Sequence, residues 1–185
     1  MEALLVSTAV VALAEMGDKT QLLTFVLAAK YKQPWPILLG ILVATLANHA
    51  FAGVLGVWLA SVVSPDTLRG LVAASFFGFG LWALVPDKLE GSPKDRAASV
   101  FLTTLVAFFL VEMGDKTQLA TVALAARYQA LALVVAGTTL GMMLANAPAV
   151  WLGDRLAHKV DMKLMRIIAA ALFVLLGVVT LLVPT

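Results

Sequence analysis

The chain carries the same eight residues twice, Glu-Met-Gly-Asp-Lys-Thr-Gln-Leu, at Glu15–Leu22 and again at Glu112–Leu119. Each copy lies inside a long apolar run, so four carboxylates and two lysines occupy segments where a lipid environment makes charge costly. Charged groups in such positions usually mark function. Because the whole string recurs, we expect two halves of the chain to contribute equivalent groups to one site.

The composition predicts an all-α polytopic membrane protein. Of the 185 residues, 62% are hydrophobic and only 13% are charged, which is too little polar surface for a soluble globular domain. Apolar stretches of about 20 residues recur along the chain, and this is the length that an α-helix needs to cross a bilayer. The absence of cysteine excludes disulfides and thiolate metal sites.

Apolar runs and breakers predict six transmembrane helices arranged as two three-helix repeats. The two strings are 97 positions apart, and the same offset aligns Gly40 with Gly137 and Arg69 with Arg166. We therefore predict a first repeat over residues 1–86, a linker over 87–98 and a second repeat over 99–185. The expected spans cover about residues 3–29, 35–62, 67–86, 99–126, 130–156 and 164–183.

Three helices per repeat is an odd number, so the second repeat must enter the membrane from the opposite side to the first. Nine basic residues fall in the loops of one predicted side, whereas only Arg69 and Arg127 fall on the other. The positive-inside rule then places the central loop in the cytoplasm and both termini outside. The nine are Lys30, Lys32, Lys88, Lys94, Arg96, Arg155, Lys159, Lys163 and Arg166.

On an uninterrupted α-helix, Glu15, Asp18 and Gln21 would share one face across an arc of roughly 120°. The corresponding residues of the second copy would do the same. Because inverted repeats make the two helices antiparallel, we expect these polar faces to meet near the bilayer midplane. Gly17 and Gly114 lie between the acids, where a small residue allows close helix contact or a local break in the helix.

The side chains of the two strings form an all-oxygen ligand set, which suits Ca²⁺, Mn²⁺ or Mg²⁺. The carboxylates are the expected ligands, with the threonine hydroxyls and glutamine amides in support. Four carboxylates less two lysines leave a charge of −2, which one divalent cation would neutralise. Without the cation, clustered acids repel one another and should take up protons, so metal and protons would compete for the same oxygens. The residues are Glu15, Asp18, Glu112 and Asp115, supported by Lys19, Thr20, Gln21, Lys116, Thr117 and Gln118.

Several of these residues have a second interpretation. Buried acid–lysine pairs can simply tie helices together, and we expect the lysines to be counter-charges rather than ligands. Asn48 and Asn146 could complete the coordination or form interhelical hydrogen bonds. For His49, whose counterpart is Ala147, we expect a hydrogen-bonded helix histidine rather than an asymmetric proton-handling group.

The paired strings, in the form E-x-G-D-K-T, resemble the signature of a family of cation/proton exchangers that includes bacterial manganese exporters and Golgi calcium/manganese–proton antiporters, within the wider calcium/cation antiporter group. The resemblance covers the whole chain and both strings match it without departure. It implies that Glu15, Asp18, Glu112 and Asp115 bind the transported cation. The short central loop resembles that of a compact bacterial member, which implies the inner membrane as its location.

We therefore expect a secondary transporter that exports a divalent cation from the cytoplasm in exchange for protons, by alternating access around the carboxylates. Mn²⁺ is the first candidate cation and Ca²⁺ the second. A passive divalent-cation channel is the alternative. We do not expect an enzyme, because the chain has no His-Glu-x-x-His motif and its acids come as two equivalent sets. The expected partners are the cation, protons and the bilayer, without nucleic acid or a resident cofactor, and a homo-oligomer stays open.

Overall fold

The computed structural model describes residues 1–85, 99–152 and 162–182. These residues form eight α-helices and no strand, which confirms the all-α prediction. The helices are α1 (Glu2–Glu15), α2 (Lys19–Tyr31), α3 (Pro34–Val62), α4 (Pro65–Ala83), α5 (Val100–Glu112), α6 (Lys116–Tyr128), α7 (Leu131–Leu152) and α9 (Met162–Leu182). The predicted linker over 87–98 and the loop residues Lys88, Lys94, Arg96, Arg155 and Lys159 lie outside the described residues.

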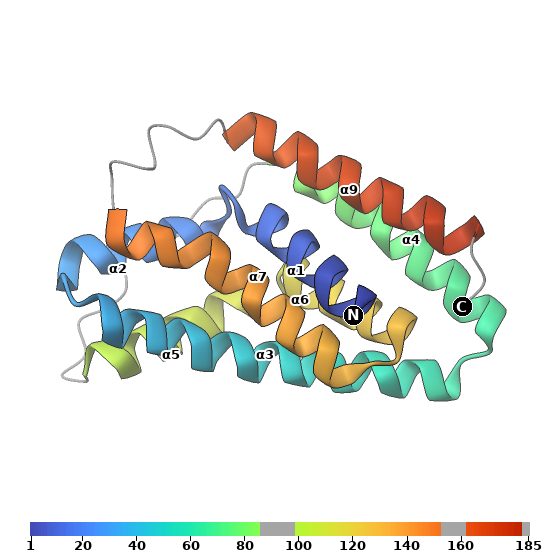
Figure 1. Ribbon diagram of the computed structural model, residues 1–185, viewed down its shortest axis with the longest axis horizontal. Helices are drawn as coiled ribbons and strands as arrows, with labels where there is room; N and C mark the ends of the chain where they lie inside the picture. Colours follow the sequence, from blue (N-terminus) through green and yellow to red (C-terminus); the bar gives the residue numbers. More distant parts are fainter. Residues whose placement is uncertain (86–98, 153–161, 183–185) are drawn as a thin grey trace.

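Helices at equivalent places in the two halves make equivalent contacts. Helix α1 packs along α7, and its counterpart α5 packs along α3, the counterpart of α7. Helices α4 and α9 pack against each other and lie side by side along one edge of the molecule (Figure 1). Phe76, Phe79 and Phe173 are buried between them, with ring centroids 5.8–6.5 Å apart. The core is therefore formed between the halves as much as within them.

Small residues allow these contacts between the halves. A Cβ atom on Gly40 would lie 2.7 Å from the Cβ of Thr104, and one on Gly137 would lie 2.5 Å from the backbone oxygen of Leu4. Gly40 and Gly137 occupy equivalent positions, and so do the segments that they touch. Gly141, one turn beyond Gly137, also faces α1, so the two glycines form one helix-contact face.

The first and fourth predicted spans are each broken in the middle. The structure therefore shows the local break that was one of the two alternatives at Gly17 and Gly114, and the single face expected on a continuous helix is wrong. Helix α1 ends at Glu15 and α2 begins at Lys19, while α5 ends at Glu112 and α6 begins at Lys116. The glycines at the breaks have positive φ angles, 83° at Gly17 and 77° at Gly114, a conformation that favours glycine. Apolar residues flank both strings, and within each string the glycine was the signal of a break.

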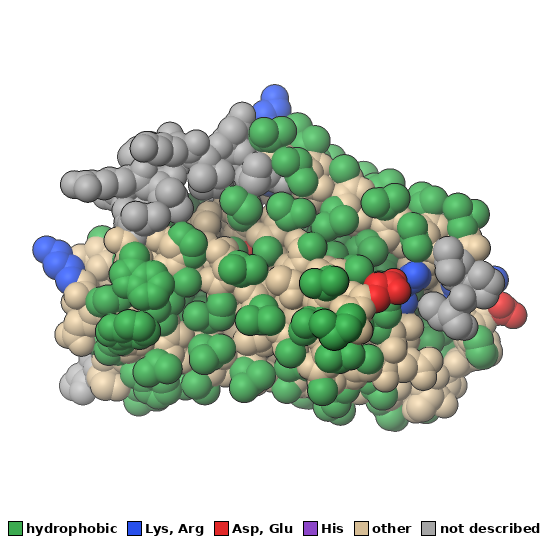
Figure 2. All heavy atoms as spheres, viewed as in Figure 1, with side chains coloured by type: hydrophobic (Ala, Val, Ile, Leu, Met, Phe, Trp, Pro, Cys, Tyr) green, Lys and Arg blue, Asp and Glu red, His purple; other side chains and the backbone are tan. Residues whose placement is uncertain are grey.

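Two helices, Pro34–Val62 and Leu131–Trp151, are long and apolar enough to cross a membrane by length and composition. Each half of a broken span has only 13 or 14 residues, which is too short to qualify alone. Apolar side chains cover the middle of the face in Figure 2, and its charged side chains lie mostly toward the edges. Helix α3, for example, exposes the large apolar side chains of Leu39, Val43, Leu46, Phe51 and Val54.

The contact between α1 and α7 provides a test of this packing. In Gly141→Ala, the new methyl group would lie 2.6 Å from the backbone oxygen of Thr8 and 2.9 Å from the backbone nitrogen of Ala12. Because backbone atoms cannot move aside without moving the helix, we expect a loss of about 1–3 kcal/mol of stability. Thermal unfolding of the purified protein in detergent would measure it as a lower midpoint.

Gly78→Ala is the matched control, since no atom lies within 4 Å of its added methyl group and the position is an exposed one in α4. We expect an unchanged or slightly raised midpoint there, because alanine is the better helix former. Equal midpoints for the two variants would show that α1 and α7 do not pack as described.

Candidate cation site

The two helix breaks bring the four carboxylates of the strings into one buried region. Glu15 and Glu112 are completely inaccessible, and Asp18 and Asp115 are 1% exposed. One oxygen each from Glu15, Glu112 and Asp115 lies within 4.8 Å of the others, a grouping that could hold a metal ion. Asp18 is buried beside them without belonging to this closest group.

Two ion pairs cross from one string to the other. Lys19 Nζ lies 2.8 Å from Asp115 Oδ1, and Lys116 Nζ lies 3.1 Å from Asp18 Oδ2. The pairs are reciprocal, since each aspartate binds the lysine that follows its counterpart. Each lysine is therefore paired with an aspartate of the other string. Each aspartate also caps the half-helix that it precedes, accepting a hydrogen bond from a backbone N–H of its first turn.

The glutamates are held differently, by the threonine of their own string. Thr20 Oγ1 donates a hydrogen bond to Glu15 Oε2 across the break, and Thr117 Oγ1 donates to Glu112 Oε2 at 3.2 Å. In both residues the other oxygen, Oε1, is buried and has no hydrogen-bond partner among the described residues. Each half thus presents one unpaired carboxylate oxygen in the buried region.

The glutamines of the strings stabilise the breaks. Gln21 Oε1 accepts a hydrogen bond from the N–H of Gly17 at 2.9 Å, and Gln118 Oε1 accepts one from Gly114 at 2.7 Å. These bonds satisfy backbone donors that the interrupted helix leaves without a partner. The side-chain amides reach the neighbouring long helices, where Gln21 Nε2 donates to the carbonyl of Ala145 and Gln118 Nε2 to Asn48 Oδ1.

The two asparagines form hydrogen bonds between helices. Asn48 Nδ2 donates to the carbonyl of Phe109 at 3.2 Å, and Asn146 Oδ1 accepts from Thr24 Oγ1 at 2.7 Å. The expected hydrogen bond of His49 is absent, because neither ring nitrogen has a partner among the described residues although the side chain is fully buried. The expectation failed because residue type alone does not reveal whether a facing helix offers a donor or an acceptor.

This arrangement divides the charges of the site into two classes. The crossed pairs neutralise both aspartates, and the remaining charge of −2 belongs to the two glutamates when both are ionised. The glutamates also stand at the C-terminal ends of α1 and α5, where helix dipoles favour a cation and disfavour a carboxylate. Two carboxylates at such positions, with unpaired oxygens, suit either a divalent cation or protons.

Comparison with known proteins identifies the family. A family model described as the divalent cation/proton antiporter GDT1 matches residues 3–91 and 100–184, and each matched segment contains one copy of the string. The chain belongs to the GDT1 family. This confirms the family resemblance that the E-x-G-D-K-T strings indicated. The GDT1 family consists of membrane transporters rather than enzymes.

Relatives of the chain are named either as GDT1-like proteins or as a manganese exporter. A Vibrio cholerae protein named "Putative manganese exporter" is 48% identical over 181 residues, covering 97% of this chain and 90% of the relative. "GDT1-like protein 5" of Arabidopsis thaliana is 29% identical over 217 residues, covering 96% of this chain and 94% of the relative. No solved structure matches the chain significantly. Membership of GDT1 supports a divalent-cation exporter.

The crossed ion pairs yield a test, because their lysines differ in burial. The Lys116 side chain is 3% exposed, whereas that of Lys19 is 24% exposed. Removing one partner of a buried pair leaves an uncompensated charge at a cost of about 3–5 kcal/mol, and water reduces this cost where it has access. We therefore expect Lys116→Gln to lower the thermal midpoint clearly more than Lys19→Gln.

The two single variants are controls for each other, because Lys19 and Lys116 occupy equivalent positions in the two halves. The double variants Lys116→Gln/Asp18→Asn and Lys19→Gln/Asp115→Asn should regain part of the lost stability, since each removes both members of a pair. Equal losses for the two single variants would contradict the described difference in burial.

Proposed function

We propose that this protein exports a divalent cation, Mn²⁺ in the first place, from the bacterial cytoplasm in exchange for protons. The observation that carries the proposal is the pair of glutamates, Glu15 and Glu112, each held by a threonine through one oxygen and unpaired at the other. The cation is the transported substrate. Glu15, Glu112 and Asp115 would be its ligands, and Asp18 would join them through a small movement away from Lys116.

The reciprocal contacts support an inverted repeat with six membrane spans. Contacts in which each half uses the same residues against the other are characteristic of two-fold symmetry. With α1 and α2 counted as one broken span, and α5 and α6 as another, the halves over 1–86 and 99–185 have three spans each. An odd number per repeat then requires opposite orientations in the membrane. We place the central linker in the cytoplasm and the termini outside, on the distribution of lysine and arginine.

Charge balance supports exchange with protons. A divalent cation neutralises the two glutamates, and so do two protons, whereas leaving both carboxylates ionised and unpaired in a buried site is costly. Cation and protons therefore exclude each other from the same oxygens. A protein that presents these oxygens alternately to the two sides of the membrane exchanges one for the other.

The preference for Mn²⁺ rests on ligand chemistry and on one relative. An oxygen-only set suits Mn²⁺, Ca²⁺ and Mg²⁺ alike. The Vibrio cholerae relative named as a manganese exporter favours Mn²⁺ among the three, and its similarity extends over nearly the whole chain.

Transport measured in proteoliposomes tests the proposal. We expect Mn²⁺ uptake or efflux to follow an imposed pH gradient and to reverse with it. Glu15→Gln and Glu112→Gln should each reduce the initial rate by at least about 10- to 100-fold, the loss typical of disturbing even an outer partner of a metal ligand. Asp66→Asn is the control, because Asp66 is an acid on the exposed surface of α4 and should leave transport unchanged.

Flux that ignores the pH gradient and runs near the diffusion limit would overturn the exchange mechanism in favour of a passive channel. If flux driven by the pH gradient persists in Glu112→Gln, the protein exchanges cations for protons but does not use Glu112 to do so. Parallel measurements with Ca²⁺ and Mg²⁺ give the selectivity.

A binding experiment isolates the competition from transport. Mn²⁺ added to the protein in detergent should release protons, because the cation displaces them from Glu15 and Glu112. Calorimetric titrations in two buffers of different ionisation enthalpy would measure the number released. We expect a smaller release in Glu15→Gln than in wild type and no change in Asp66→Asn. Binding with no proton release across the pH range would contradict shared oxygens.

A further inference from the structure

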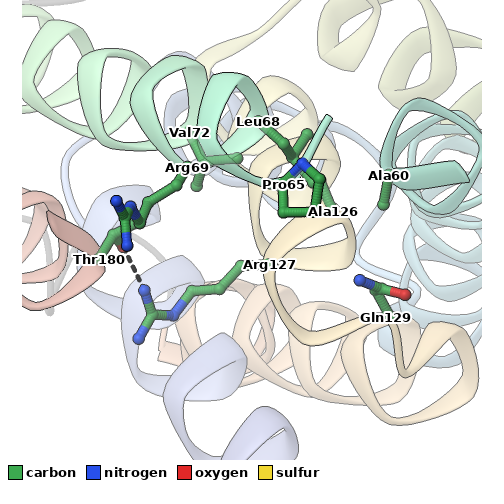
Figure 3. A pocket seen from close by; sticks show the side chains of 9 residues that line it. All are labelled: Ala60, Pro65, Leu68, Arg69, Val72, Ala126, Arg127, Gln129 and Thr180. Atoms are coloured by element: carbon green, nitrogen blue, oxygen red, sulfur yellow. Dashed lines mark hydrogen bonds between the residues drawn. The ribbon is translucent and has the colours of Figure 1, made fainter. Parts of the chain in front are cut away.

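A polar pocket lies where α4, α6 and α9 meet (Figure 3). It is at the end of α6 opposite the carboxylates of the strings. Its volume is about 110 Å³, and its polar lining is two arginines, Arg69 of α4 and Arg127 of α6, with Thr180 of α9 and Gln129. These residues stand at helix ends: Arg127 and Gln129 lie at the end of α6, Arg69 in the first two turns of α4 and Thr180 near the end of α9. The proposed exchange mechanism makes no use of this pocket.

Arg127 is a buried arginine that has no carboxylate partner among the described residues. Only 8% of the residue is exposed, and it forms no ion pair with any carboxylate of the described residues. One guanidinium nitrogen donates to Thr180 Oγ1, the group lies 5.5 Å from the ring centroid of Tyr128, and the buried Nε has no hydrogen-bond partner. A buried cation in this state is costly unless an anion completes the site.

Arg69 adds a second positive charge to the same pocket. Its described acidic partner is Asp66, 3.3 Å away, whose side chain is 93% exposed. Such an exposed pair is weak, because water screens it. Figure 3 shows both arginine side chains reaching toward Thr180. The pocket therefore offers two guanidinium groups, whose planar N–H donors match the oxygens of a phosphate.

An apolar groove of about 380 Å³ adjoins this pocket. The two share Leu68, Val72 and Ala126 as lining residues. Beyond them the groove continues between α3, α4 and α6 along aliphatic side chains such as Leu59 and Val122. A cationic pocket joined to an apolar groove matches a molecule with an anionic head and a hydrocarbon chain.

The duplication of the chain does not explain the pocket. At the offset of 97, the position equivalent to Arg127 is Lys30, which is exposed, and the position equivalent to Thr180 is Ala83. The buried arginine and its threonine partner therefore belong to one end of the molecule only. By the orientation proposed above, this end faces away from the cytoplasm.

We propose that this pocket binds the phosphate of an anionic phospholipid, with an acyl chain in the adjoining groove. The guanidinium groups of Arg127 and Arg69 donate hydrogen bonds to the phosphate oxygens, and Arg127 Nε gains the partner that it lacks. A bound lipid would hold α4 and α6 together at the end opposite the start of α6, where Asp115 and Lys116 lie. The proposal depends on membrane insertion but not on proton exchange.

Native mass spectrometry of the purified protein in detergent tests this assignment. Dioleoyl phosphatidylglycerol is titrated against dioleoyl phosphatidylcholine, which has the same chains and no net charge. We expect phosphatidylglycerol to bind Arg127→Gln about tenfold more weakly than wild type, since the variant loses the charge-assisted hydrogen bonds to the phosphate. Lys30→Gln removes a positive charge at the equivalent position of the other half and should bind phosphatidylglycerol as wild type does.

Four results would overturn the proposal. Equal affinity for the two lipids would show that the pocket does not recognise an anionic head, and an equal loss in Lys30→Gln would show a general effect of charge. Stabilisation by inorganic phosphate alone, as large as that by phosphatidylglycerol and dependent on Arg127, would assign the pocket to a free anion. If Arg127→Gln does not fold, Arg69→Gln replaces it, because Arg69 is partly exposed; unchanged lipid binding there would also contradict the proposal.

Discussion

The crossed ion pairs between the two strings are the constraint on which the site depends. Each string places an aspartate and a lysine at the start of a half-helix, inside the protein, where an unpaired charge is costly. The ion pairs join Asp18 to Lys116 and Asp115 to Lys19, so each half supplies the counter-charge that the other needs. This reciprocity explains why the string occurs twice and why neither half is a site alone. It also fixes the two breaks face to face, which sets the distance between the glutamates.

The glycine and the polar residues of the repeated string have distinct physical tasks. Glycine adopts the positive φ that ends one half-helix and allows the next to begin, and glutamine accepts the backbone N–H released by the break. Aspartate and lysine join the halves, while threonine holds one oxygen of glutamate and leaves the other unpaired. A continuous helix could not combine these tasks, because its glutamate would not stand at a helix C-terminus. The break therefore creates the electrostatic environment that favours a cation.

Much of this could be predicted from the sequence, since duplication at a fixed offset predicts which residues are equivalent. The meeting of the four acids in one buried region and the equivalence of Gly40 and Gly137 followed from it. The different partners of the aspartates and the glutamates could not be predicted in this way. Side-chain directions were predicted for a continuous helix, and a break changes the direction of every side chain beyond it. His49 shows the same limit, since its environment depends on groups from distant helices that no local pattern encodes.

The two halves are equivalent in sequence at the strings but differ in their surroundings. Lys19 and Lys116 have identical neighbours from Glu15 to Leu22 and from Glu112 to Leu119, yet the side chain of Lys19 is eight times as exposed, 24% against 3%. Chemistry within the strings cannot produce this difference, so it comes from how the halves are packed. If the halves form the inverted repeat proposed above, a second packing exists in which they exchange surroundings. In that conformation Lys116 would be the more exposed lysine. The described asymmetry is thus what the proposed alternating access would require of any single state, because equivalent carboxylates then lie in unequal surroundings.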